Sequence, residues 1–150
     1  MYKSFNLKIA DLMNKGVFYV SVNDTIKKAD EIMHKEKIKH LPVVEGTKYV
    51  GLITERNIME YTLRQLYDAE DNMGDAAYNQ ILDFERIITR QAQVIYPEDS
   101  VAKAIKMMAK YRLDCLPVVD WQMNLLGIIT TTDIMLFVHK LMEEYEASNS

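Results

Sequence analysis

The sequence predicts a mixed α/β protein, of the α+β type, with two β-α-β-β-α units packed pseudo-symmetrically into one module. Three observations support this fold class: a motif that occurs twice in one register, short strand-like segments that alternate with helix-period segments, and a composition typical of folded chains. The chain has 150 residues, of which 49% are hydrophobic and 27% are charged. This length suits one compact domain or two very small ones.

The internal repeat is clearest at His40–Val44, because its Leu-Pro-Val-Val returns in Cys115–Val119. The match continues downstream, where the segment 51–54 is similar to 127–130, with one extra residue between the motifs in the second copy. A unit of about 50 residues cannot bury enough apolar surface alone, so each copy is expected to need the other. We expect the first unit at 8–62, a helical connector at 63–83 and the second unit at 84–142.

Each unit is expected to contain the same elements in the same order. In the first unit a β-branched segment at 17–22 predicts a strand, and Thr25 is a good N-cap for the helix that follows. The Leu-Pro-Val-Val segment and residues 49–53 then predict a hairpin. A second helix is expected to begin at Thr54, and at Thr130 in the other unit. The N–H groups that remain free beyond such a cap would bind an anion.

Charge and apolar runs exclude several classes of partner. The chain has 18 Lys and Arg against 22 Asp and Glu, so its net charge of -4 provides no general attraction for nucleic acid or anionic lipid. Residues 1–12 lack the apolar stretch of a signal peptide, and no apolar run approaches the roughly 18 residues of a membrane span. The single Cys115 excludes an internal disulfide and suits a reducing compartment. We expect a cytoplasmic protein with no nucleic-acid or membrane partner.

No pattern in the chain predicts catalysis. Nucleophile-base pairs, paired carboxylates and phosphate-binding glycine loops are absent, and His34, His40 and His139 lack the spacing of metal ligands. Cys115 is expected to be a small packed hydrophobe, because the neighbouring Asp114 opposes a thiolate. We therefore expect no enzyme, no metal and no obligatory cofactor.

The two motifs together carry a family resemblance. Leu-Pro-Val-Val followed by Gly-x-x-Thr-x-x-(Asp/Asn)-Ile-Met, present twice, resembles the cystathionine-β-synthase (CBS) domain. The tandem arrangement is similar to a CBS pair, or Bateman module, of the stand-alone bacterial and archaeal type, and the resemblance covers nearly the whole chain. It implies a regulatory module that binds an adenosyl compound, AMP, ADP or ATP, in two clefts between the paired domains.

The resemblance implies one complete cleft, formed by the Thr-x-x-Asp segment of the second unit and by residues of the first. Asp133 would accept hydrogen bonds from both ribose hydroxyls, and basic side chains would face the phosphates. The residues implied are Phe18, Tyr19, Lys39, His40, Arg56, Ile129, Thr130, Thr131, Thr132 and Asp133.

The opposite cleft departs from the family pattern. Asn57 replaces the ribose carboxylate, while Asp114 and Cys115 stand where the other cleft has two basic residues. The weaker set implied is Thr54, Asn57, Gln93, Asp114 and Cys115. We expect one competent nucleotide site and a second that is empty, weak or adapted to an uncharged group.

Simpler interpretations of these residues stay open. Asp133 could be a first-turn acid that offsets the helix dipole, with Thr130 an ordinary cap. His40 could be a half-buried side chain with a satisfied ring nitrogen. Arg56 could pair with Glu55 or Glu60 on a solvated face.

The preferred function is an adenine-nucleotide sensor that signals to an unknown target protein by changing the shape of a homodimer. The C-terminal helix supports the dimer, because residues 134–142 are apolar over more than one stripe. The alternative is a ligand-free interaction or scaffold module that uses the dimer and the tyrosine-rich connector as its contact surface.

Overall fold

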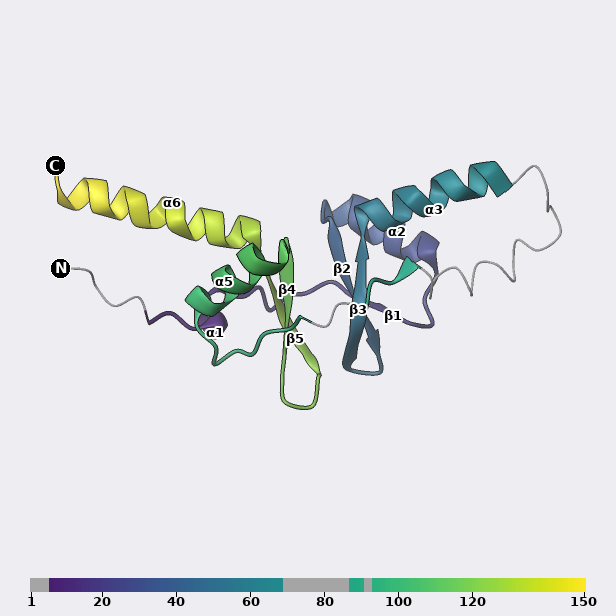
Figure 1. The fold of residues 1–150 in the computed structure, drawn as a ribbon, viewed down its shortest axis with the longest axis horizontal. Coiled ribbons are helices and arrows are strands. Elements are labelled where there is room, and N and C mark those ends of the chain that lie inside the picture. The colour runs from purple at the N-terminus through teal and green to yellow at the C-terminus, as the bar shows by residue number, and fades with distance from the viewer. Residues whose placement is uncertain (1–5, 69–86, 91–92) are drawn as a thin grey trace. The chain divides into compact units, whose positions relative to one another are not determined.

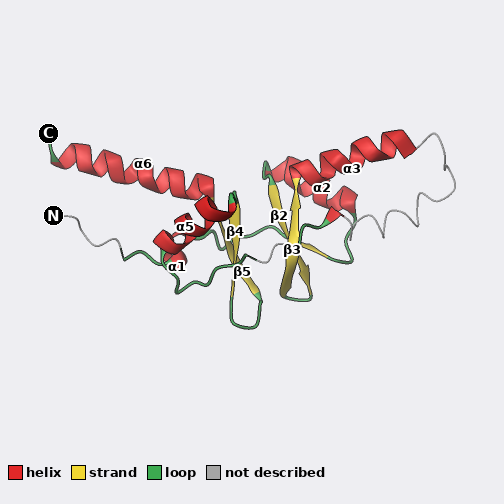
Figure 2. Ribbon diagram, viewed as in Figure 1, coloured by secondary structure: helices red, strands yellow, loops and turns green. Residues whose placement is uncertain are grey.

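The computed structural model describes residues 6–68, 87–90 and 93–150, and it has the mixed α/β class that the repeat predicts (Figures 1 and 2). The chain divides into two compact units. One unit contains Phe18–Ala92, and the other combines Met1–Val17 with Gln93–Ser150. Residues 69–83 of the expected connector lie outside the described residues.

The unit of the first repeat contains a three-stranded sheet in the order β1-β2-β3. β1 (Val20–Ser21) pairs in parallel with β2 (His40–Glu45), which pairs antiparallel with β3 (Lys48–Thr54). Helix α2 (Ile26–Glu36) lies between β1 and β2 in the sequence, α3 (Glu55–Asp68) follows β3, and the two helices pack against each other. The hairpin and both helices therefore follow the order expected from the sequence.

The unit of the second repeat has the same hairpin, formed by β4 (Cys115–Val119) and β5 (Leu125–Thr130). The place of a first strand is taken by a single parallel bridge between Ile95 and Val118. Helix α5 (Val101–Tyr111) packs on β4, and α6 (Thr131–Ser148) continues directly from β5 and leads away from the hairpin (Figure 2).

The first helices of the two repeats begin and end in the same way. Thr25 and Ser100 each accept a hydrogen bond from the N–H of the third helical residue, so the caps expected from the sequence are formed. Lys37 and Arg112 each end their helix in the left-handed conformation, with a φ of 53°. The two first helices are therefore similar in backbone geometry as well as in sequence.

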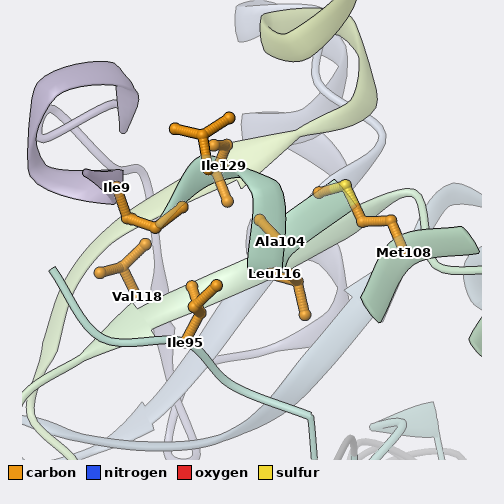
Figure 3. Packing of buried hydrophobic residues seen from close by; sticks show 8 residues of the cluster. Ile9, Ile95, Ala104, Met108, Leu116, Val118 and Ile129 are labelled. Atoms are coloured by element: carbon orange, nitrogen blue, oxygen red, sulfur yellow. The ribbon is translucent and has the colours of Figure 1, made fainter. Parts of the chain in front are cut away.

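Each unit has its own apolar core, filled from one face of its first helix and from its hairpin. The core of the first unit consists of Val20, Ala29, Met33, Leu41, Val43, Ile53 and Ile87. The core of the second consists of Ile9, Ile95, Val101, Ala104, Met108, Leu116, Val118 and Ile129 (Figure 3). Met33 and Met108 occupy equivalent core positions, which agrees with methionine as a core-filling residue.

Each core also contains residues from the start of the other repeat. Helix α1 (Ile9–Leu12) lies at the start of the first repeat but belongs to the unit of the second, where Ile9 N donates to Asp99 O at 2.8 Å. Thr89 lies near the start of the second repeat but exchanges two backbone hydrogen bonds with Leu52 of β3. The sequence boundaries 8–62 and 84–142 remain a prediction, while the compact units exchange these short segments.

The helices in the described ranges are all too short or too polar to cross a lipid bilayer.

Candidate functional site

The start of α6 holds the Thr-x-x-Asp motif in a reciprocal cap. Asp133 N donates to Thr130 Oγ1 at 3.1 Å, while Thr130 N and Thr130 Oγ1 donate to Asp133 Oδ2 at 2.8 and 2.9 Å. Both hydrogen bonds to the carboxylate use Oδ2, and Oδ1 has no partner in the described part of the chain. The cap therefore orients a half-buried carboxylate and leaves one of its oxygens free to accept further hydrogen bonds.

The same helix start offers fewer N–H groups to an anion than its sequence suggests. Thr131 N donates to Asp114 O at 2.9 Å, and Asp133 N is used by the cap. Only Thr132 N remains without a partner among the first three residues of α6. The side chain of Ile129 is fully buried in the core, so Ile129 could contribute to a site only through its backbone.

The start of α3 repeats this arrangement with an amide in place of the carboxylate. Thr54 N donates to Asn57 Oδ1 at 3.0 Å, and Asn57 N donates to Thr54 Oγ1 at 3.1 Å. Thr89 Oγ1 also donates to Asn57 Oδ1, at 3.3 Å. The amide oxygen is thus used by the cap, and the group that Asn57 has left is an NH₂, which can only donate. The two repeats therefore present opposite hydrogen-bonding characters at equivalent positions.

The cations expected near a phosphate belong to the unit of the first repeat. Arg56 Nε donates to Glu60 Oε1 at 3.2 Å on an exposed helix face, so the pairing with Glu60 is confirmed. Lys39 is exposed, and its carbonyl accepts from Glu55 N at 3.0 Å. His40 is half-buried at the start of β2, opposite Thr54, and takes part in an interaction of its own.

The two aromatic residues of the expected complete site are exposed. Phe18 and Tyr19 precede β1 and expose 45% and 56% of their surface. Exposed aromatic rings of this size can stack on a planar ligand such as a purine base. The joint site made of these residues, the cations and the start of α6 stays a prediction, because its members belong to both units.

The weaker set of expected site residues includes a buried thiol, that of Cys115, next to the acidic Asp114. Cys115 is 2% exposed, and its pKa is raised to about 12 by burial and by the negative charge of Asp114. The expectation of a packed hydrophobe at Cys115 is confirmed, and its thiol is not poised to react. Asp114 is exposed and Gln93 is half-buried, and both have interactions within the chain.

Sequence reasoning missed one contributor, Thr89, whose hydroxyl contacts Asn57 from a segment that no motif marks. Its position follows from the backbone pairing with Leu52, a long-range contact that leaves no local signal. Across the described ranges, His, Cys, Asp and Glu side chains form no group that could hold a metal ion.

The raised pKa of Cys115 gives a prediction for pH dependence. The folded state keeps the proton up to about pH 12, whereas the unfolded thiol loses it near its ordinary pKa of 9.0. The contribution of this group to the free energy of unfolding is therefore complete below pH 9 and falls as the pH rises towards 12. Chemical denaturation at pH 8, 9 and 10 should show a steeper loss of stability in the parent chain than in Cys115→Ala, and equal slopes would contradict the assignment.

Comparison with known proteins identifies the repeats. The family description "CBS domain" matches residues 9–64 and 84–140. The CBS domain-containing protein YhcV of Bacillus subtilis is 30% identical over 126 residues, which cover 84% of this chain and 81% of that protein. The crystal structure of the CBS domain pair of protein MJ0100, in complex with 5'-methylthioadenosine and S-adenosyl-L-methionine, has a TM-score of 0.70 and 30% identity. That comparison covers 89% of this chain and 97% of the MJ0100 chain.

Some relatives are much longer than this chain. The homoserine O-acetyltransferase of Methanosarcina acetivorans is 28% identical over 130 residues, which cover 86% of this chain but 21% of the enzyme. The shared part is thus the CBS region of a larger protein. The chain belongs to the CBS domain family and contains two CBS domains in tandem.

Proposed function

We propose that this chain is a regulatory CBS pair that binds an adenosyl ligand and is not itself an enzyme. The observation that carries the proposal is the carboxylate of Asp133, which the cap at Thr130 orients while one of its oxygens stays free to accept hydrogen bonds. A cis-diol such as that of ribose supplies two O–H donors to one carboxylate, and charge-assisted bonds of this kind are strong. The ligands printed for the MJ0100 domain pair, both adenosyl compounds, support the same ligand class.

The other expected residues complete this proposed site. Phe18 or Tyr19 stacks on the adenine, and Lys39, His40 and Arg56 face the phosphates of AMP, ADP or ATP. Arg56 must exchange Glu60 for the phosphate, which costs little because both side chains are exposed. Thr132 N and the hydroxyls of Thr131 and Thr132 donate to the same anion.

The site at the other helix start is proposed to be weak. The free group of Asn57 is a donor, so it cannot accept from both ribose hydroxyls, and Asp114 repels a phosphate. We propose that the ligand acts in a cytoplasmic homodimer and that its binding changes the surface offered to a target protein. Such a shift requires different affinities for the two arrangements of the dimer.

The replacement Asp133→Asn tests the site without removing the cap. Asn57 keeps the same cap geometry at the equivalent position of α3, so asparagine is expected to fold normally at 133. A charged hydrogen bond contributes about 1.5 to 3 kcal/mol, so the affinity for the adenosyl ligand should fall by about 10- to 100-fold. Calorimetry with AMP, ADP, ATP, S-adenosyl-L-methionine and 5'-methylthioadenosine on ligand-stripped protein measures the change.

The matched control is Asn57→Asp, which supplies the missing acceptor to the weaker position. It should leave the strong site unchanged and raise the affinity of the weak one. Two equal sites in the parent chain would contradict the asymmetry. If none of the five compounds binds, the adenosyl proposal is wrong and the ligand-free scaffold alternative is supported.

A further inference from the structure

The hairpin of the second repeat carries an exposed aromatic pair at its turn. The rings of Tyr96 and Trp121 stack with their centroids 4.4 Å apart and an interplanar angle of 18°. Trp121 nevertheless exposes 77% of its surface, so Tyr96 covers one face of the indole and leaves the other face open. We call these two residues the aromatic platform.

The backbone holds the aromatic platform at the turn end of the hairpin between β4 and β5 (Figure 2). Val119 N donates to Ile95 O at 3.0 Å, which brings the segment of Tyr96 alongside the turn. Thr130 lies at the opposite end of the hairpin, where it pairs with Cys115. The aromatic platform is therefore separate from the capped start of α6.

The turn beside the platform is ordered by its own hydrogen bonds and contains a strained methionine. Gln122 N and Asn124 N each donate to Asp120 Oδ1 at 2.9 Å. Met123 has a φ of 67°, in the left-handed region where the first hairpin has Gly46 with a φ of 64°. Met123 is 36% exposed, so burial in the core does not account for a methionine at this position.

The aromatic platform is specific to the second repeat. The offset of 75 residues places Ser21 where the second repeat has Tyr96. The turn of the first hairpin, residues 45–48, contains no aromatic residue, and the extra residue of the second copy lies in the turn 120–124. The fold of a CBS unit therefore forms without the platform, and the platform is available for another use.

The charge around the platform is acidic. The segments 93–100 and 119–127 contain Glu98, Asp99 and Asp120 but no Lys or Arg. Asp99 is paired with Lys103 at 3.0 Å, whereas Glu98 is exposed and has no ion-pair partner in the described part of the chain. The printed partners of the Asp120 carboxylate are neutral N–H groups of the turn. Charge complementarity therefore selects a cationic partner.

We propose that the aromatic platform is the docking site for a segment of the target protein that presents an arginine. The planar guanidinium stacks on the open face of Trp121, while Glu98 and Asp120 supply the opposite charge. Met123 packs on the apolar stem of the arginine, a contact that suits its adaptable side chain. The inference rests on the regulatory role proposed above, because it states the chemistry by which the target protein is recognised.

The fluorescence of Trp121 tests the preference for arginine, because this residue is the only tryptophan in the chain. Capped tetra-arginine should change the emission saturably. It should bind at least about threefold more tightly than capped tetra-lysine, which has the same charge but no planar group to stack. Equal affinities for the two peptides would overturn the proposed stacking.

Variants locate the binding of tetra-arginine by calorimetry. Trp121→Ser and Glu98→Gln should each weaken it by at least about threefold. Met123→Gly should weaken it without loss of folding, because glycine adopts the left-handed conformation freely. The matched control is Tyr111→Ser, which removes an exposed ring that already has Lys110 Nζ 5.2 Å from its centroid. An equal loss in this control would indicate general attraction to an acidic chain and would overturn the site.

Other occupants of the platform give different results. Trp121 emission that shifts with protein concentration alone would indicate a second copy of the chain. A shift with phosphatidylcholine vesicles but not with tetra-arginine would indicate a lipid surface, and either result would overturn arginine docking. Calorimetry with the adenosyl compounds is independent of these measurements. If they fail to bind while tetra-arginine binds as expected, the ligand proposal is wrong and the docking site stands.

Discussion

Replacing Ile9 by alanine is expected to lower the free energy of unfolding by about 3 kcal/mol, although this residue lies at the start of the first repeat and packs in the core of the second unit. Ile9 is 0% exposed and points from α1 into the core of the second unit, beside Val118 and Ile129 (Figure 3). Truncation removes buried apolar atoms and leaves a cavity between α1 and the hairpin. Urea unfolding followed by circular dichroism measures the loss.

The control is Ile105→Ala on the same unit, because Ile105 is 44% exposed on α5. It deletes the same atoms without opening a cavity and should cost less than about 1 kcal/mol. Equal losses for the two variants would mean that α1 does not complete this core. Shifts in the amide signals of the second repeat, recorded for Ile9→Ala, would show which unit is affected.

Much of the fold could be predicted from the sequence because its signals are local. Thr25 and Ser100 are good caps, and both caps are formed. The Leu-Pro-Val-Val motif and its partner strand form a hairpin in both repeats. These elements depend on residues within a few positions of one another, so the repeat could be aligned without knowledge of tertiary contacts.

The exchange of segments could not be predicted in this way. Ile9 and Thr89 lie in short segments outside the motifs, and their partners are far away in the chain. Other backbone hydrogen bonds occupy N–H groups at the helix starts. Thr131 N and Glu55 N are already bonded to the carbonyls of Asp114 and Lys39, which the repeat pattern does not reveal.

The sequence predicts that the sites at the two helix starts differ in strength, but it does not predict which hydrogen-bonding group each site leaves free. The sequence shows Asp133 against Asn57, and this difference indicates a stronger and a weaker site. Only the structure shows that the cap uses one oxygen in each case. The remaining groups are therefore an acceptor and a donor, which is a sharper distinction than the loss of a charge.

The glycine of each Gly-x-x-Thr motif has a physical reason that the motif alone does not give. A Cβ at Gly127 would lie 2.8 Å from Asn14 O and 3.0 Å from Met13 Sδ. Asn14 exchanges two backbone hydrogen bonds with Ile128, so this carbonyl cannot retreat without breaking them. Gly51 is confined in the same way by Ile88 and Thr89. Both glycines lie where an exchanged segment pairs with the hairpin.

Gly127→Ala is therefore expected to destabilise the chain by about 2 kcal/mol, because the added methyl group must displace the backbone at Asn14. The amide hydrogen of Ile128, which donates to Asn14 O at 3.1 Å, should exchange with solvent faster in the variant. Gly16→Ala is the matched control, since a Cβ there would meet only Asn14 Oδ1 at an ordinary 3.7 Å. It should leave both the unfolding free energy and the exchange of Ile128 close to the parent values. Unchanged exchange at Ile128 in Gly127→Ala would mean that the N-terminal segment is held by Ile9 and its neighbours alone, and that the glycine is not needed for their approach.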